Sequence, residues 1–109
     1  MATIQETLCA AIDSKNLVKF YYEDEAPGYR TVEPHMVAYT SKKHLVLLAW
    51  LLGGASESQG HKPGRKPWRQ YLLSDTSDIT VLPDKFTGPR PGYKPNGGKI
   101  FHNIQCALP

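Results

Sequence analysis

The 109-residue sequence lacks the features that mark membrane, secreted and disulfide-rich proteins. Its longest uninterrupted apolar run, residues 45–52, has eight residues, far fewer than the roughly 20 that a membrane-spanning helix needs. Residues 1–10 contain no basic stretch before an apolar segment, so no secretory signal is expected. The two cysteines, Cys9 and Cys106, are too few for a disulfide scaffold. These absences predict a small, soluble, cytoplasmic domain with no membrane partner.

The sequence also has little that indicates metal binding or catalysis. No CxxC or HxxxH pair exists among the two cysteines and the four histidines, His35, His44, His61 and His102. We therefore expect no metal site and no cofactor. Neither Gly-Gly pair, at 53–54 or at 97–98, is followed by the Lys-Ser/Thr of a phosphate-binding loop. The clustered carboxylates at 23–25 fall in a predicted turn, where solvation is their usual role. We predict that the protein is not an enzyme.

Glycine and proline are abundant instead, with nine residues of each. They predict many turns and argue against long helices, while 40% apolar residues are enough to bury a core. The length fits one domain over residues 1–109. The charge is uneven, because residues 1–60 have five Lys/Arg and seven Asp/Glu, whereas residues 61–109 have eight and three. Clustered positive charge of this kind either attracts phosphate or serves only solubility.

The residue pattern predicts one helix followed by strands. Residues 3–15 form the helix, because Thr3-Ile4-Gln5-Glu6 has the form of a capping box and apolar residues then recur at helical spacing. Residues 17–82 contain the strands, with residues 44–52 as the buried central one. Pro34 should lie at an edge or a bend. Residues 53–67 read as a long exposed loop, and residues 83–109 as a Pro/Gly-rich extension. A small, mainly β, antiparallel barrel with one N-terminal helix is the expected fold.

The order of several short motifs resembles the WYL domain family. A helix is followed by Lys15 and the aromatic run Phe20-Tyr21-Tyr22, then by Arg30-Thr31-Val32-Glu33-Pro34. Trp68-Arg69-Gln70-Tyr71 is similar to the Arg-x-Phe strand of that family. The stretch from Val81 to Tyr93, ending in Phe-Thr-Gly-Pro-Arg-Pro-Gly-Tyr, resembles short, free-standing members. The naming tripeptide Trp-Tyr-Leu is replaced here by His44-Leu45-Val46.

This resemblance implies an SH3- or Sm-like barrel whose basic and aromatic strand residues line a ligand patch. Better-studied members are accessory regulatory domains of bacterial transcription factors or defence proteins, and are thought to sense nucleic acid or a nucleotide. Arg30 and Arg69 occupy positions that match the family pattern. The chain has no room for the helix-turn-helix that such regulators usually carry.

The residues themselves also suggest a binding face. Guanidinium groups bind phosphate oxygens and aromatic rings stack on bases, as in small barrels that hold single strands. The candidate ligand-binding residues are Arg30, Arg69, Tyr29, Tyr71, Trp68, His44, Lys62, Arg65 and Lys66. The alternative is that Trp68 and Tyr71 belong to the core and that the basic loop residues are only solvated.

The C-terminal extension has three interpretations. Its polar and basic residues could extend the binding face, through Arg90, Tyr93, Lys94 and Lys99. Residues 89–93 could instead form an architectural strap, because a proline-fixed backbone loses little entropy on ordering and Tyr93 could fasten it to the barrel. A third use is as a polyproline ligand for another protein.

We therefore expect a non-catalytic, ligand-sensing or regulatory module that binds single-stranded nucleic acid or a nucleotide-like anion. The alternative hypothesis is a protein-interaction or homo-oligomerisation module without a nucleic-acid ligand, which would use exposed strand edges.

Overall fold

The structure, a computed structural model, describes residues 2–23, 27–54 and 67–109. The elements in chain order are α1 (Ile4–Ser14), β1 (Asn16–Tyr22), β2 (Gly28–Thr40), β3 (Leu45–Gly54), β4 (Trp68–Leu72), the 3₁₀ turn η1 (Leu73–Asp75), β5 (Thr76–Lys85) and β6 (Phe101–Ala107). The prediction of a mainly β protein with one N-terminal helix is confirmed. In the described ranges, no helix has the length and apolar content needed to cross a membrane.

Helix α1 begins at the capping box that the sequence predicts. The Thr3 hydroxyl oxygen accepts from the Glu6 backbone N–H at 3.1 Å, and the Glu6 carboxylate accepts from the Thr3 backbone N–H at 2.9 Å. The helix ends at Lys15, which adopts a left-handed conformation. One face, formed by Leu8, Ala11 and Ile12, is buried against the sheet. The helix is too short to be stable alone, so this packing holds it in place.

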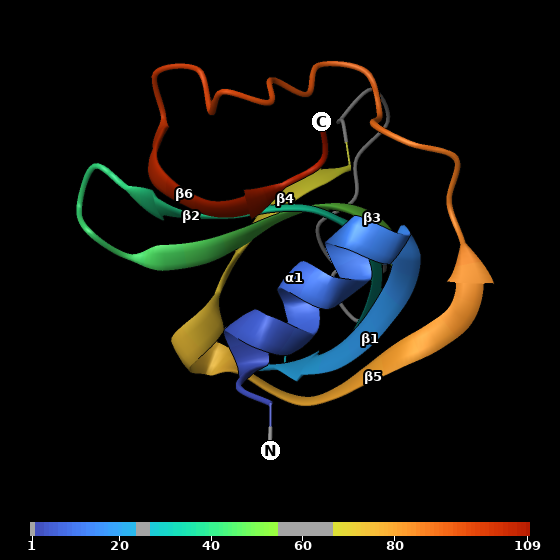
Figure 1. The fold of residues 1–109 in the computed structure, drawn as a ribbon. Coiled ribbons are helices and arrows are strands. Elements are labelled where there is room, and N and C mark those ends of the chain that lie inside the picture. Colours follow the sequence, from blue (N-terminus) through green and yellow to red (C-terminus); the bar gives the residue numbers. More distant parts are fainter. Residues whose placement is uncertain (1, 24–26, 55–66) are drawn as a thin grey trace.

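The six strands form one antiparallel sheet in the order β4-β3-β2-β1-β5, and β6 pairs with β2 outside this path. The sheet curves around α1, which packs against β1, β2, β5 and β6 (Figure 1). Strands β4 and β5 lie at opposite ends of the path, so the sheet is open. A closed barrel, as expected from the sequence, is therefore not confirmed.

Strand β2 differs most from the sequence-based expectation. We predicted that Pro34 lies at an edge or a bend, but Pro34 lies in the middle of a 13-residue strand between β1 and β3. The edge interpretation was wrong. Pairing of β2 with β3 changes register between Pro34 and Met36, and β1 pairs only before Pro34 and β6 only after it. A proline is tolerated at such an irregularity because its missing N–H removes no regular ladder bond.

The buried side chains form two clusters on opposite faces of the sheet. The larger cluster lies between α1 and the sheet and includes Leu8, Ile12, Phe20, Val32 and Tyr71. The smaller cluster contains Met36, Ala38, Val46 and Phe101. Tyr93 packs against both clusters. The C-terminal extension is therefore an integral part of the packing, and it positions the candidate site.

Candidate ligand-binding site beneath the C-terminal strap

Residues 86–93, here called the strap, lie against β2 and β4. The indole N–H of Trp68 donates to the Pro91 carbonyl oxygen at 2.9 Å. The backbone N–H of Arg90 donates to Nε2 of His35 at 3.1 Å. The strap contains two prolines, Pro89 and Pro91, whose fixed φ angles leave the backbone less freedom to lose on ordering. The architectural-strap interpretation is confirmed by these contacts.

His35 lies at the centre of the strap's attachment and is fully buried. Because Nε2 accepts a hydrogen bond, the proton of the neutral ring is assigned to Nδ1, which donates to the Glu33 carbonyl oxygen at 2.8 Å. Burial lowers the pKa of His35. The aromatic rings of Trp68, Phe86 and Tyr93 surround the imidazole. Neutral His35 is therefore the acceptor that holds the strap backbone.

An ion pair fastens the middle of the strap. The guanidinium of Arg90 donates to both carboxylate oxygens of Glu33, at 2.7 and 2.8 Å, and lies 5.1 Å from the ring centroid of Trp50. Hydrogen bonding to Glu33 raises the pKa of Arg90. Arg90 therefore has a structural role here.

Tyr93 ends the strap and connects it to the C-terminus. Its hydroxyl oxygen lies 2.9 Å from the Leu108 carbonyl oxygen and 3.2 Å from that of His35, and donates its proton to them. Burial raises the pKa of Tyr93 to about 12. The hydroxyl is consequently protonated at neutral pH and remains a donor. Its ring stacks nearly parallel to Trp68, with the ring centroids 6.3 Å apart.

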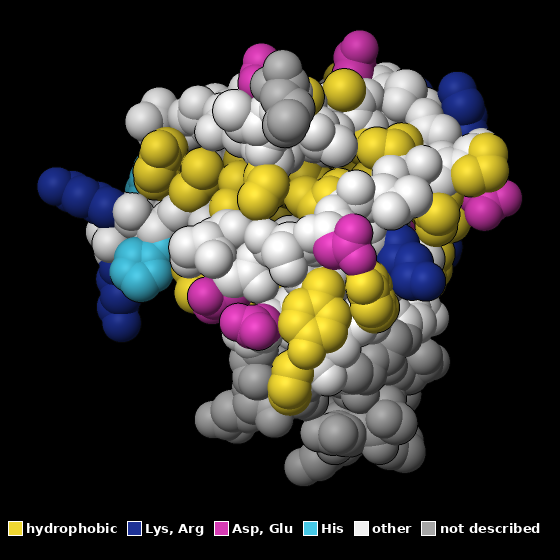
Figure 2. All heavy atoms as spheres, turned by 90° about the horizontal axis from the view of Figure 1, so that it is seen from below, with side chains coloured by type: hydrophobic (Ala, Val, Ile, Leu, Met, Phe, Trp, Pro, Cys, Tyr) yellow, Lys and Arg dark blue, Asp and Glu magenta, His cyan; other side chains and the backbone are white. Residues whose placement is uncertain are grey.

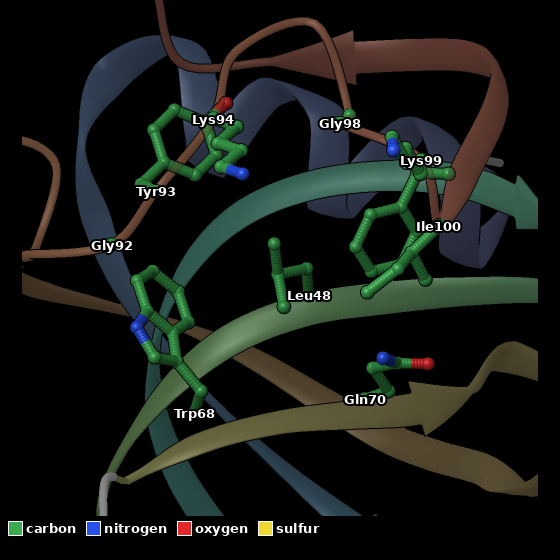
Figure 3. Close-up of a pocket in the computed structure, with 11 residues that line it drawn as sticks. Leu48, Trp68, Gln70, Gly92, Tyr93, Lys94, Gly98, Lys99 and Ile100 are labelled. Carbon is green, nitrogen blue, oxygen red and sulfur yellow. The ribbon is translucent and has the colours of Figure 1, made fainter.

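A pocket of about 330 Å³ lies where the chain after the strap passes over β3 and β4. We call it the strap pocket. Trp68 and Tyr93 stand at one end, Lys99 and Ile100 at the other, and Leu48 lies between them (Figure 3). Its lining residues are Leu48, Trp68, Gln70, Gly92, Tyr93, Lys94, Gly97, Gly98, Lys99, Ile100 and Phe101. The volume lies at the lower end of the range for small-molecule sites. It suits one planar ring system with a small substituent.

The chemistry of this lining is aromatic and cationic. Trp68, Tyr93 and Phe101 supply rings, and Gln70 supplies an amide that can donate and accept. Lys94 and Lys99 are exposed and supply positive charge, and no carboxylate is among the described lining residues. The pocket can therefore hold a flat ring by stacking and an attached anion by charge.

Two residues predicted to bind ligand are buried. Arg30 is 0% exposed, and its guanidinium donates to the Gly28 carbonyl oxygen at 2.7 Å within the β1–β2 hairpin. Tyr71 is 3% exposed and packs edge-to-face on Phe20 and Tyr22. Tyr71 is therefore a core residue, which is the alternative interpretation given in the sequence analysis. Neither side chain offers surface to a ligand in this structure, so we exclude both from the candidate site.

Tyr29 and His44 lie on other parts of the molecule. The hydroxyl of Tyr29 donates to the Asp78 carboxylate, and its ring contacts Tyr21 and the ammonium of Lys19. The hydrogen bond to Asp78 raises the pKa of Tyr29. His44 is exposed in the turn between β2 and β3. Neither residue lines the strap pocket.

Of the described residues predicted to bind ligand, those in β4 lie at or next to the strap pocket. Because side chains alternate along a strand, Trp68 and Gln70 face the pocket, whereas Tyr71 faces the core. Arg69 is partly exposed next to Trp68, whose carbonyl oxygen accepts from its guanidinium at 2.8 Å, and it lines a shallower hollow with Leu48 and Gln70. The predicted residues Lys62, Arg65 and Lys66 lie outside the described residues.

Several pocket residues escaped the sequence-based prediction. Leu48, Ile100 and Phe101 resemble ordinary core residues in the sequence, and only the chain's path over β3 and β4 brings them together. The part of the pocket that the sequence could have indicated is the segment Lys94-Pro95-Asn96-Gly97-Gly98-Lys99, a turn with a lysine at each end.

A Cys9–Cys106 disulfide, which composition did not indicate, joins α1 to β6. Within the described ranges, no group of His, Cys, Asp or Glu is arranged to hold a metal ion.

A second face of the molecule shows a different charge distribution. Figure 2 shows Lys and Arg side chains at its margins, with Asp and Glu side chains between them and hydrophobic side chains across its middle. The described part of this face therefore presents no continuous cationic track for a nucleic-acid backbone. This contrast favours the strap pocket as the candidate site.

Comparisons of the chain with protein-family models, with curated proteins and with solved structures give no match. The resemblance to the WYL domain thus rests on the order of the short motifs alone.

Proposed function

We propose that the protein is a non-catalytic ligand-binding module that holds a nucleotide, free or within a single strand, in the strap pocket. The observation that supports this most is the combination of three aromatic rings with two lysines around one small pocket. The base would lie in the space between Trp68, Tyr93 and Leu48, and the phosphate would lie near Lys94 and Lys99. An SH3- or Sm-like fold and a regulatory role of the WYL type are consistent with this proposal.

The first experiment is titration with AMP, followed by tryptophan fluorescence and calorimetry at two salt concentrations. Adenosine lacks the phosphate, and ribose 5-phosphate lacks the base, so the two analogues test the two halves of the site separately. We expect AMP to bind more tightly than either analogue, and salt to weaken AMP more than adenosine. Labelled single-stranded DNA and RNA, measured by anisotropy, then show whether the nucleotide is bound free or within a strand.

Variants locate the binding. The double substitution Lys94→Gln and Lys99→Gln should lower AMP affinity about fivefold, with little effect on adenosine. Lys42→Gln is the matched control, because Lys42 is an exposed lysine in the turn between β2 and β3 and does not line the pocket. Absence of AMP and oligonucleotide binding at low salt would refute the proposal, as would equal effects of the pocket and control variants.

Assembly through strand edges, the alternative hypothesis, is less well supported. Strand β5, at one end of the sheet, contains Asp78 with a positive φ, Pro83 and the charged pair Asp84 and Lys85. Such features discourage pairing with another strand. Sedimentation at high salt tests this alternative, because edge pairing should persist where nucleotide binding weakens.

A further inference from the structure

The strap pocket depends on a strand that is covalently tied to the far end of the chain. The Cys9–Cys106 disulfide joins α1 to β6 across a sequence separation of 97 residues. Phe101, the first residue of β6, lines the pocket. Leu108, just after β6, accepts the hydrogen bond of Tyr93 through its carbonyl oxygen. Of the aromatic rings that line the pocket, Phe101 thus belongs to β6, and Tyr93 is held partly by the residue that follows it.

Non-covalent contacts attach β6 mainly to β2, with further packing on α1. Among the described strands it pairs with β2 alone, and this pairing changes register between Val37 and Tyr39. Asn103, within β6, has a positive φ, which interrupts the regular strand conformation. Most β6 side chains are exposed or partly exposed, and Phe101 and the adjacent Leu108 are the buried anchors. A strand with few buried anchors opens more readily than the core strands.

We propose that the disulfide is a redox lock on the strap pocket: oxidised, it holds β6 and the pocket in place, and reduced, it lets β6 open and lowers ligand affinity. The inference rests on the proposed function for its ligand, but its structural part stands separately. Both cysteines are partly exposed, so a small thiol can reach the sulfur atoms. A disulfide is uncommon in the cytoplasm unless it responds to redox state, which links the lock to the expected localisation.

The chemistry requires an external dithiol or two equivalents of a thiol such as glutathione. One thiolate attacks a cysteine sulfur, the S–S bond breaks, and a mixed disulfide forms while the other cysteine leaves as a thiolate. A second thiolate attacks the external sulfur of the mixed disulfide and releases the second cysteine. The protein gains two electrons and, after protonation, carries two thiols, and the reductant becomes a disulfide.

Loss of the bond acts on the pocket through β6. The link between α1 and β6 then consists of packing and of an exposed hydrogen bond from the Gln5 amide to Gln105. Each opening of β6 moves Phe101 and removes one of the two acceptors of the Tyr93 hydroxyl, the Leu108 carbonyl oxygen. The reduced protein therefore spends more time with an incomplete pocket, and apparent affinity falls in proportion to the competent fraction.

The test combines hydrogen exchange with AMP titration on the full chain. With excess reduced glutathione, amide exchange in β6 should rise about a hundredfold while β1 and β3 change little, and AMP affinity should fall about tenfold. The Cys9→Ser/Cys106→Ser variant should match the reduced protein whether or not glutathione is present. Ser14→Ala, at the C-terminal end of α1, leaves both cysteines in place and is a control that should keep the redox response.

The outcomes separate the two proposals. If oxidised protein does not bind AMP, the proposed function fails, and β6 exchange alone then decides whether the lock exists. If AMP binds but neither exchange nor affinity responds to reduction, the lock is refuted. Failure of glutathione to reduce the bond in folded protein also refutes it, as does global unfolding on reduction, which would make the disulfide a general staple.

Discussion

The Glu33 carboxylate receives two hydrogen bonds from the Arg90 guanidinium, at 2.7 and 2.8 Å, although 57 residues separate the two in sequence. Glu33 is 4% exposed within β2, whereas 41% of the Arg90 side chain remains accessible. The pair therefore places the positive side chain of the strap on a carboxylate that would otherwise be buried without its charge partner. A buried carboxylate that loses such a partner destabilises the fold more than the pair itself stabilises it.

This relationship predicts the effect of Arg90→Gln. The substitution should lower the free energy of unfolding by about 2 kcal/mol, because it leaves the Glu33 carboxylate without its charged partner in a mainly buried position. Urea unfolding measures this change. Arg90→Lys keeps the charge but loses the two-pronged geometry, so an intermediate loss is expected. Equal stability of all three proteins would show that the ion pair contributes nothing.

The state of His35 predicts an acid-sensitive strap. Burial lowers the pKa of His35 below its usual value, with the Glu33 carbonyl, the Arg90 guanidinium and the Tyr93 ring packed near it. The unfolded chain therefore takes up a proton near pH 6.5 while the folded protein does not. The contribution of neutral His35 to the free energy of unfolding is fully present above about pH 6.5. It is lost as the pH falls towards the pKa of His35 in the folded protein.

The measurement is urea unfolding at about pH 7.5 and about pH 5. His35→Gln should be less stable than the wild-type protein at the higher pH, yet lose less stability on acidification, because the titrating group is gone. His44→Gln, which alters an exposed turn residue, is the matched control. An unchanged acid response in His35→Gln would contradict this account.

The sequence predicted local features well and tertiary ones less well. The capping box at Thr3 and Glu6 depends on residues three apart, and it was found where predicted. The edge alternative for Pro34 was wrong, because tolerance of a proline inside the sheet depends here on a register change against β3, which no local pattern shows. Arg30 looked like a phosphate ligand because charge predicts exposure, yet the β1–β2 hairpin buries it. The pocket joins β3, β4 and the C-terminal extension, so only the folded chain reveals it.

Gly97 predicts a direct link between backbone conformation and the pocket. Its φ is +83°, and an added Cβ would lie 2.8 Å from the Phe101 carbonyl oxygen. Gly97→Ala should therefore destabilise the protein by about 1–2 kcal/mol and weaken AMP binding, since Phe101 must shift. Gly88→Ala is the comparison, because Gly88 also has a positive φ but an added Cβ there meets no atom within 4 Å. Similar AMP affinities for the two variants would argue against a role for the Phe101 position.

Substitution of Arg30 and substitution of the two pocket lysines should have opposite effects on stability and on AMP affinity. If Arg30 were a ligand residue, Arg30→Lys would weaken AMP binding and spare stability. Its complete burial and its 2.7 Å hydrogen bond to the Gly28 carbonyl predict the reverse. We expect a loss of about 2 kcal/mol in the free energy of unfolding, because a lysine cannot satisfy the guanidinium's geometry in a buried site. AMP affinity, measured under conditions in which the variant remains folded, should change less than about twofold, since Arg30 does not line the strap pocket. The Lys94→Gln/Lys99→Gln protein should show the opposite pattern, with stability retained and affinity reduced. A variant of Arg30 that stays fully stable and loses AMP would move the binding site from the strap pocket to the β1–β2 hairpin.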